Sequence, residues 1–425
     1  MEETPDSLQN ASSQQVATRQ FSTQCCIVGG GPAGMMLGFL LARAGVQVLV
    51  LEKHADFFRD FRGDTIHPST LELLWELGLL SEFLKIPHQQ FSELTLDLNG
   101  RILRGPDFSH LPTHCRFIAL APQWDFLNFL AAQAARYPLF QLLMKTQATQ
   151  LLKTGDTITG VIAESDEEHL EIQADLVVGA DGRHAVTRTQ ADFELEEFGV
   201  PIDVLWYRLN KRPGDQVGHA LGHIREGHML VTLDRGEYFQ CGTIIRKGRF
   251  PEVQSQGLEE FRRQILNLVP VSRQTVEELQ SWEQIKLLTV QLNRLKQWQR
   301  PGLLCIGDAA HAMSPVGGVG VNIAIQDAVA TANLLAEKLA QRTVTLKDLQ
   351  QVQHYREPAV RRTQAVQAFL HRRMFPETGD FGRSWLLSAP VRCLLTPFAP
   401  LLRRFAGRMI GMGIQPEHVH TPERL

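Results

Sequence analysis

The chain has 425 residues, of which 44% are hydrophobic and 21% charged, a composition typical of a globular protein with a large buried core. Its formal net charge of −3 gives no overall attraction to polyanions, so we expect no nucleic-acid partner. The six cysteines form no C-x-x-C pair and no Cys/His metal spacing, which indicates a reduced, cytoplasmic protein without a structural metal. No unbroken apolar run is long enough to cross a bilayer.

The first motif follows a polar stretch, residues 1–20, for which we predict a disordered tail. An apolar run of strand length, residues 25–28, stops at glycines, and apolar residues then recur at helical spacing. The turn between strand and helix consists of Gly29, Gly30, Gly31, Pro32, Ala33 and Gly34. In this G-x-G-x-x-G pattern Gly29 allows the turn, Gly31 lets a pyrophosphate approach the backbone, and Gly34 lets the helix pack closely on the strand.

A second apolar strand, Val46–Leu51, ends at Glu52, which is followed by Lys53. Glu52 lies 18 residues beyond Gly34 (52 − 34), close to the roughly 20 residues expected for a carboxylate that binds both ribose hydroxyls. We therefore predict an adenine dinucleotide near the N-terminus.

The next elements are mostly helices and antiparallel strands. Ser69 is predicted to cap a helix that ends at Gly78, with Glu72 at the capping-box position. Alternation over residues 92–98, followed by Asn99-Gly100 and a return strand at 101–104, predicts a hairpin. A helix is expected from Gln123 to Ala135, a second antiparallel block at 201–290 and mainly helices after residue 346.

Two further motifs stand at the ends of apolar strands. The first is Gly179-Ala180-Asp181-Gly182, and the second begins at Gly307-Asp308 and continues to Asn322. A buried strand delivers Asp308 to its carboxyl end, where ligands of open α/β sheets bind, and a carboxylate there can accept bonds from ribityl hydroxyls. Helix amides near Gly318–Asn322 are placed to stabilise negative charge on a bound cofactor.

With these three motifs in order, the sequence resembles the class A flavoprotein monooxygenases, the family of p-hydroxybenzoate hydroxylase. The resemblance implies FAD as cofactor, NAD(P)H as co-substrate and oxygen transfer to substrate through a flavin C4a-hydroperoxide. It places Asp181 at the flavin and the pyridine-nucleotide step, and Gln123 and Arg62 against the flavin. Arg188 matches a motif arginine, whereas Ala185 stands where the family usually has serine.

The resemblance also assigns residues of the third motif. Pro315 lines the flavin and substrate face, and with Gly318 it is our candidate catalytic pair. The cofactor-binding set from this stretch is Gly307, Asp308, Gly320, Val321 and Asn322. For His311 we expect a motif residue bonded to backbone rather than an acid or base.

The resemblance implies an α/β fold: a Rossmann-like FAD-binding domain, an antiparallel-sheet substrate domain and a helical C-terminal region. We assign residues 21–85, 112–195 and 296–345 to the first, 86–111 and 196–295 to the second, and 346–425 to the third. Alternation puts Val204, Trp206 and Arg208 on one strand face, and Tyr238 and Gln240 on another. Trp206 and Tyr238 are the candidate substrate contacts.

The segment Val391–Ile410 mixes apolar residues with arginines and contains no acids. Two interpretations stay open: peripheral contact with an anionic membrane, which suits a lipophilic substrate, or closure over the protein's own surface. The predicted function is a monooxygenase that hydroxylates or epoxidises an aromatic or polycyclic small molecule. The alternatives are a FAD-dependent reductase of isoprenoid double bonds and a non-redox flavin-binding protein.

Overall fold

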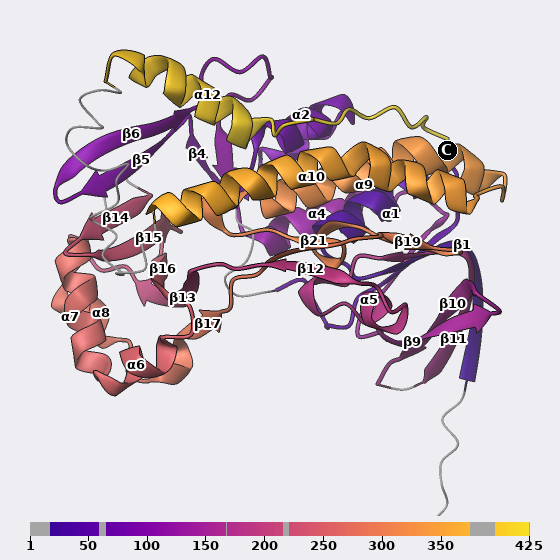
Figure 1. Ribbon diagram of the computed structural model, residues 1–425, viewed down its shortest axis with the longest axis horizontal. Coiled ribbons are helices and arrows are strands. Elements are labelled where there is room, and N and C mark those ends of the chain that lie inside the picture. Colours follow the sequence, from indigo (N-terminus) through magenta and orange to yellow (C-terminus); the bar gives the residue numbers. More distant parts are fainter. Residues whose placement is uncertain (1–17, 59–64, 167, 216–220, 375–395, 425) are drawn as a thin grey trace, which may run out of the picture.

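The computed structural model describes residues 18–58, 65–166, 168–215, 221–374 and 396–424. Two large sheets lie at opposite ends of the view in Figure 1, and two long helices, α9 (Gly320–Ala340) and α10 (Leu346–Met374), run side by side across them.

The first large sheet is the parallel unit expected from the glycine motif. Its strand order is β19-β20-β11-β1-β2-β8, and β1 is paired in parallel with both β2 and β11. The strands are β1 (Thr18–Val28), β2 (Val48–Leu51), β8 (Phe140–Leu143), β11 (His169–Gly179), β19 (Gln299–Arg300) and β20 (Leu303–Cys305). Outside this order, β10 (Thr157–Glu164) pairs antiparallel with β11, and β9 (Gln147–Thr154) pairs antiparallel with β10. The predicted α/β class is confirmed.

Both faces of this sheet are buried, which explains why its strands are continuous apolar runs. Cys25 and Ile27 of β1 pack in the cluster of α1 (Pro32–Arg43), α4 (Gln123–Ala134) and α9, whereas Cys26 and Val28 pack against β9 and β10. The cysteines in the described part of the chain are buried and free, so they act as small hydrophobic residues there.

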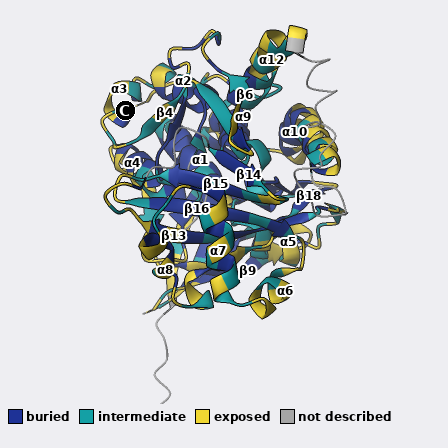
Figure 2. Cartoon of the chain, turned by 90° about the vertical axis from the view of Figure 1, so that its left-hand side faces the viewer, coloured by how far each residue is buried: buried dark blue, intermediate teal, exposed yellow. Residues whose placement is uncertain are grey.

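The helix α9 is the core helix of this unit. By length and composition the stretch Val316–Ala340 is apolar enough to cross a membrane, but 78% of its most apolar window is buried inside the fold. The helix packs against α1 and α10. Figure 2 shows the buried segments in the interior of the molecule and the exposed residues mainly at its rim. Its apolarity is therefore explained by tertiary packing.

The second large sheet has the order β17-β13-β16-β15-β14-β5-β6. Its strands are β5 (Glu93–Leu98), β6 (Arg101–Asp107), β13 (Ile202–Asn210), β14 (Gly222–Arg225), β15 (His228–Asp234), β16 (Tyr238–Arg246) and β17 (Lys286–Leu288). The predicted hairpin turn is confirmed, because Asn99 and Gly100 have φ of 50° and 81° between β5 and β6.

The two faces of this seven-stranded sheet have different neighbours. Leu205, Tyr207 and Phe239 pack against α7 (Leu258–Leu268) and α8 (Arg273–Glu277), with α6 (Phe250–Ser255) beside them (Figure 1). Val204 and Trp206 lie in a different cluster that includes Val316, from the turn that precedes α9. The second face is therefore the one toward the parallel unit.

Two three-stranded sheets, which the sequence patterns did not indicate, join these units. One has the order β3-β7-β4 and the other β12-β18-β21. Their strands are β3 (Thr65–Ile66), β4 (Gln89–Phe91), β7 (Ile118–Leu120), β12 (Leu195–Phe198), β18 (Leu292–Leu295) and β21 (His311–Ala312).

Two local predictions were wrong. The strand β1 begins at Thr18, so residues 18–20 are not part of a disordered tail, and residues 1–17 lie outside the described residues. The helix α2 (Pro68–Glu76) begins at Pro68 after His67 rather than behind a Ser69 cap. Proline suits the first helical position because its missing N–H would have no partner there, and Glu72 instead accepts bonds from His114.

The C-terminal region is helical only in part. After α12 (Ala399–Gly411), residues Met412–Arg424, which we name the C-terminal strap, run without regular structure over α2, α9 and α10 (Figure 1). Side chains from those helices hold it: Gln326 donates to Met412 O, Asn333 to His418 O, and Glu76 accepts from Val419 N. Two further short helices are α3 (Leu80–Phe83) and α5 (Val186–Gln190).

Candidate active site

Four candidate segments lie at one edge of the parallel sheet. Gly29 follows β1, Glu52 follows β2, Asp181 follows β11 and Asp308 follows β20, and these four strands are parallel neighbours. The carboxyl ends of parallel strands meet at the same edge, which is where open α/β sheets bind ligands. The fold therefore brings together residues that are up to 279 positions apart (308 − 29).

The glycine loop at the end of β1 has the shape of a phosphate cradle. A Cβ on Gly29, whose φ is +107°, would lie 2.4 Å from Ala180 O, and a Cβ on Gly34 would lie 2.0 Å from Gly29 O. A Cβ on Gly31 would meet nothing within 4 Å. Gly31 caps α1 without a side-chain bond, and Pro32 occupies the first turn. The amides of Ala33 and Gly34 therefore have no side-chain cap at the start of α1, the kind of helix N-terminus that binds phosphate groups.

The carboxylate of Glu52 accepts hydrogen bonds from neighbouring residues at the edge of the sheet. Its Oε2 accepts from Gly30 N at 3.1 Å, and its Oε1 accepts from His54 N at 3.0 Å and contacts His54 Nδ1 at 2.5 Å. These bonds hold the Glu52 carboxylate at the carboxyl end of β2, beside the glycine loop. The sequence did not indicate His54 as a partner, and Lys53 beside it is exposed.

Asp181 is bound by the turn that follows it. Its carboxylate accepts from Thr187 N at 3.0 Å and from Thr187 Oγ1 at 2.7 Å. Burial raises the pKa of Asp181, and the bonds from Thr187 offset part of this shift. Ala185 has no hydroxyl group, and the hydroxyl that donates to Asp181 comes from Thr187, two positions after the expected serine.

Asp308 has a partner that the sequence patterns missed. Arg183 Nε donates to its Oδ2 at 3.2 Å, and the two side chains are 25% and 34% exposed. Arg188, the motif arginine, donates to Arg183 O at 2.5 Å and to Ala309 O at 3.4 Å, so it joins the second and third motifs. The side chain of Asp308 is therefore at the surface of the edge and paired with a cation.

The turn before α9 is built from two left-handed glycines, with φ of +83° at Gly317 and +63° at Gly318. Gly318 N donates to Pro315 O at 3.0 Å, so this amide is used within the turn. The amides of Gly320, Val321 and Asn322 begin α9, which has no side-chain cap. These three amides, rather than that of Gly318, are the ones placed to stabilise a negative charge.

The side chain of Asn322 has a structural task as well. Its Oδ1 accepts from His67 N at 3.0 Å and from Thr70 Oγ1 at 2.7 Å, and its Nδ2 donates to Thr65 O at 3.2 Å. Thr65 in turn donates to Gly318 O at 3.0 Å. Asn322 thus fastens the glycine turn to the start of α2, at a distance in sequence that no local pattern reveals.

Gln123 is buried and begins α4, directly after β7 and Pro122. The loop that leaves β2 reaches this helix, because the rings of Phe58 and Trp124 lie 4.9 Å apart. Arg62 lies outside the described residues.

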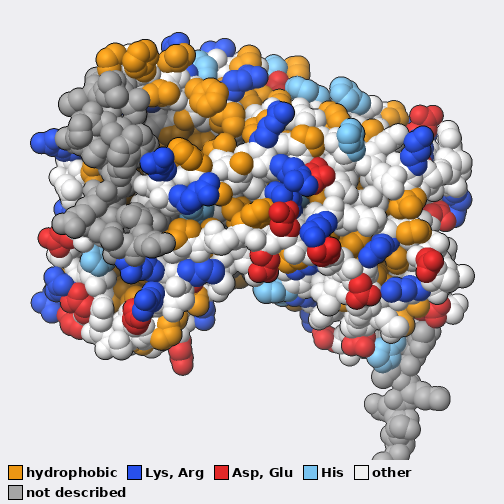
Figure 3. All heavy atoms as spheres, in the orientation of Figure 1, with side chains coloured by type: hydrophobic (Ala, Val, Ile, Leu, Met, Phe, Trp, Pro, Cys, Tyr) orange, Lys and Arg blue, Asp and Glu red, His pale blue; other side chains and the backbone are white. Residues whose placement is uncertain are grey.

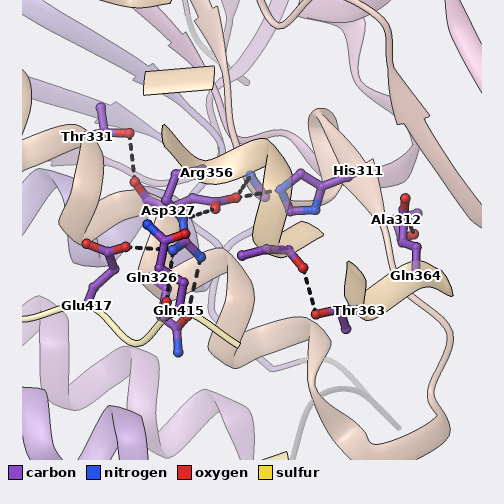
Figure 4. A network of polar contacts seen from close by, with 12 residues as sticks. His311, Ala312, Gln326, Asp327, Thr331, Arg356, Thr363, Gln364, Gln415 and Glu417 are labelled. Carbon is purple, nitrogen blue, oxygen red and sulfur yellow. Dashed lines mark hydrogen bonds and ion pairs between the residues drawn. The ribbon is translucent and has the colours of Figure 1, made fainter. Parts of the chain in front are cut away.

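The expectation for His311 was wrong. Its Nε2 does not contact backbone but lies 2.6 Å from Oδ2 of Asp327, and both side chains are almost completely buried. Asp327 belongs to α9 and also receives Arg356 from α10 (Figure 4). His311 is therefore part of a buried ionic chain behind the edge of the sheet.

The candidate substrate residues lie on the face of the seven-stranded sheet toward the parallel unit. Trp206 is half-buried in a cluster with Val204, Ile244 and Val316, and it lies over Gly242, where a Cβ would be 3.0 Å from its ring. The Tyr238 ring is covered by the Arg208 guanidinium at 4.0 Å. Gln240, which is buried on the same face, accepts from Arg235 Nε at 3.4 Å.

Comparison with known proteins identifies this arrangement. A family model described as an FAD binding domain matches residues 22–367. The chain is 31% identical to a 6-methylpretetramide 4-monooxygenase from Streptomyces rimosus over 387 residues, which cover 90% of this chain and 92% of that protein.

Two solved structures share the fold. OxyS anhydrotetracycline hydroxylase from Streptomyces rimosus has a TM-score of 0.71 at 21% identity, covering 92% of this chain and 76% of that chain. The Diels-Alderase PyrE3 of pyrroindomycin biosynthesis has a TM-score of 0.71 at 23% identity, covering 92% and 80%. The family match and the relative at 31% identity show that the chain belongs to the class A FAD-dependent aromatic monooxygenases, with the p-hydroxybenzoate hydroxylase-like fold.

Proposed function

We propose that this monooxygenase holds a polycyclic aromatic substrate between the Pro315–Gly318 turn and the Trp206 face of the seven-stranded sheet. The observation that carries the proposal is the shared cluster of Val316 and Trp206, because it brings the turn of the third motif against that face. Apolar walls with a few polar groups are typical of small-molecule sites, and Gln240 is a buried polar side chain on this face.

The cofactor would be held by the edge of the parallel sheet. In this proposal the Gly29–Gly34 loop binds the pyrophosphate, Glu52 with Lys53 the adenosine ribose, and Asp308 the ribityl chain. Asp181, Gln123 and Arg62 complete the set, and the amides of Gly320, Val321 and Asn322 stabilise charge at the ring system. FAD supplies the redox chemistry with NAD(P)H and oxygen, while the protein positions both partners and excludes water.

One of the chain's relatives supports a polycyclic substrate. The protein at 31% identity is a 6-methylpretetramide 4-monooxygenase, which supports a substrate with fused rings for this chain. The sheet face fits such a molecule because its exposed edge carries Arg208 on Tyr238, a cation and a phenol that can meet ring substituents. Trp206 would stack on the ring system.

The decisive experiment is a screen of polycyclic phenols and quinones for faster NAD(P)H oxidation by the purified holoenzyme. We expect a true substrate to speed reductant consumption at least tenfold and to acquire one atom from labelled oxygen, detected by mass. Turnover without oxygen would favour a reductase. Conversion of a substrate without reductant would favour a non-redox reaction, which the fold also supports in a Diels-Alderase.

We propose in addition that the outer face of α12 contacts an anionic lipid surface. Phe398, Leu401, Leu402 and Phe405 are 60%, 69%, 43% and 63% exposed, and the helix carries three arginines and no acid. Hydrophobic side chains gather with basic ones at this part of the surface in Figure 3. Such a face would keep a cytoplasmic enzyme close to lipophilic substrates.

A further inference from the structure

A chain of buried charges connects the C-terminal strap to the third motif. Arg356 on α10 donates from Nε to Asp327 Oδ1 at 3.0 Å and from one terminal nitrogen to Glu417 Oε1 at 2.6 Å. Asp327 Oδ2 accepts from His311 Nε2 at 2.6 Å and from Gly307 N at 3.2 Å. Figure 4 shows these side chains converging from separate segments.

The charges in this chain are almost completely removed from water. Arg356 and Asp327 are 0% exposed and Glu417 is 4% exposed. Burial alone would raise the pKa of Asp327, but His311 and Arg356 outweigh it and the net shift is downward. Burial raises the pKa of Glu417, and Arg356 lowers it in part. The neighbouring His311 and Arg356 thus favour the charged form of the Asp327 carboxylate.

A buried network of charged side chains adds little net stability to a fold, because apolar side chains of similar volume stabilise it equally well without the desolvation penalty. What this network does provide is a fixed hydrogen-bond acceptor for one particular backbone amide. That amide belongs to Gly307, which has a φ of +58° and lies between Ala33 of α1 and Ala324 of α9, each 3.2 Å from the place of a Cβ. The next residue along the chain is Asp308.

We propose that Asp327 is a positioning residue for the flavin, which sets the Gly307 turn and hence the Asp308 carboxylate, and that Glu417 acts on the same turn through Arg356. The C-terminal strap is then part of the cofactor site although it lies behind the sheet edge. This inference rests on the proposed assignment of the Gly307–Asp308 turn to FAD.

The test compares two glutamates on the strap. Glu417→Gln keeps the shape of the side chain but removes its charge beside Arg356. Glu423→Gln is the matched control, because Glu423 binds Tyr137 at 2.7 Å and Arg43 at 3.4 Å and has no contact with Arg356. Each full-length variant is stripped of flavin and titrated with FAD by fluorescence, and the unfolding of the apoprotein is measured in urea.

We expect Glu417→Gln to raise the FAD dissociation constant at least tenfold, and Glu423→Gln to change it less than twofold. Asp327→Asn should raise it at least as much as Glu417→Gln. The control for Asp327→Asn is Asp348→Asn, because Asp348 of α10 binds Lys338 of α9 and Thr345. This control variant should lower the urea midpoint without changing FAD affinity. If Asp327→Asn does not fold, the comparison of the two glutamates decides.

Two results would overturn the inference in different ways. If Glu417→Gln lowers the urea midpoint but binds FAD as the unmodified protein does, the chain is structural and the positioning role is wrong. If Asp308→Ala also leaves the FAD dissociation constant unchanged, the turn does not bind FAD and the proposed cofactor site is wrong as well.

Discussion

At the scale of single residues, substitutions of Gly31 and Gly34 distinguish an effect on cofactor binding from an effect on folding. A methyl group on Gly31 meets open space, whereas one on Gly34 would lie 2.0 Å from Gly29 O. We expect Gly31→Ala to keep the free energy of unfolding within about 0.5 kcal/mol and to weaken FAD binding at least tenfold, because the methyl group occupies the pyrophosphate's space.

Gly34→Ala is instead expected to lower the free energy of unfolding by about 1–3 kcal/mol, because its methyl group overlaps Gly29 O. Urea unfolding of the apoprotein and FAD titration measure the two effects separately. Normal FAD binding by Gly31→Ala would show that the loop holds no pyrophosphate.

His67 gives the stability of the protein a dependence on pH. Its Nδ1 lies 2.8 Å from Ile410 O and therefore donates, while its buried Nε2 has no hydrogen-bond partner among the described residues. Burial lowers the pKa of His67 from 6.5 to about 4. Above pH 6.5 the His67 ring is neutral in both the folded and the unfolded state. Its contribution to the free energy of unfolding therefore does not change with pH there.

As pH falls from 6.5 toward 4, the unfolded state takes up a proton that the folded state does not. The free energy of unfolding should then fall by about 1.4 kcal/mol per pH unit from this residue alone. His67→Gln should remove that part of the slope between pH 6.5 and 4.5 in urea titrations. An identical slope in the variant would mean that His67 titrates normally.

At the scale of elements, α12 has an inner and an outer face with different partners. Gly407 and Gly411 pack so closely on the protein that a Cβ would lie 1.8 Å from Asp107 O and 2.8 Å from Leu111, respectively. Arg403 donates to Gly105 O at 3.0 Å and pairs with Glu93. The inner face thus closes over the protein itself, and the outer face remains for a partner.

We expect the double change Leu401→Glu and Phe405→Glu to abolish sedimentation with vesicles rich in phosphatidylglycerol while the protein stays folded. Neutral vesicles should bind the unmodified protein more weakly, because Arg404 and Arg408 contribute through charge. Ile102→Glu, at a 60% exposed apolar residue on β6, is the matched control and should bind as before.

Vesicle binding that persists in the double variant would contradict the assignment. A concentration-dependent dimer that the double change dissolves would instead show that a second copy of the chain covers this face.

The helices and strands also show which parts of the fold sequence patterns do not predict. Each predicted helix and strand whose signal was local, such as the hairpin at Asn99-Gly100, is present because a turn residue and an alternation specify it without help from distant residues. Ser69 failed as a cap because Pro68 begins the helix one residue earlier. The small sheets β3-β7-β4 and β12-β18-β21 join strands from distant parts of the chain, which no local period indicates.

At the scale of the whole molecule, the sequence predicted where the motifs lie but not which side chains they meet. The order of the strands and the shared edge follow from apolar runs that end at glycines and acids. The partners of those acids depend on tertiary placement: Arg183 meets Asp308 across 125 positions, and Arg356 meets Glu417 across 61. His311 was misread for the same reason, since its partner Asp327 lies on the next helix.

The strand order of the parallel sheet has a consequence for how the protein is made. β1 is synthesised early, but the sheet edge that carries Gly29, Glu52, Asp181 and Asp308 is completed only when β20 pairs with β11. At about 5–20 residues per second, the ribosome needs roughly 15–60 s to go from Gly29 to Asp308. Throughout that interval the nascent chain carries the Gly29–Gly34 loop without Asp308, the residue proposed to bind the ribityl chain. A chain whose translation stops before residue 303 would contain the dinucleotide motif and lack the third motif of the proposed flavin site.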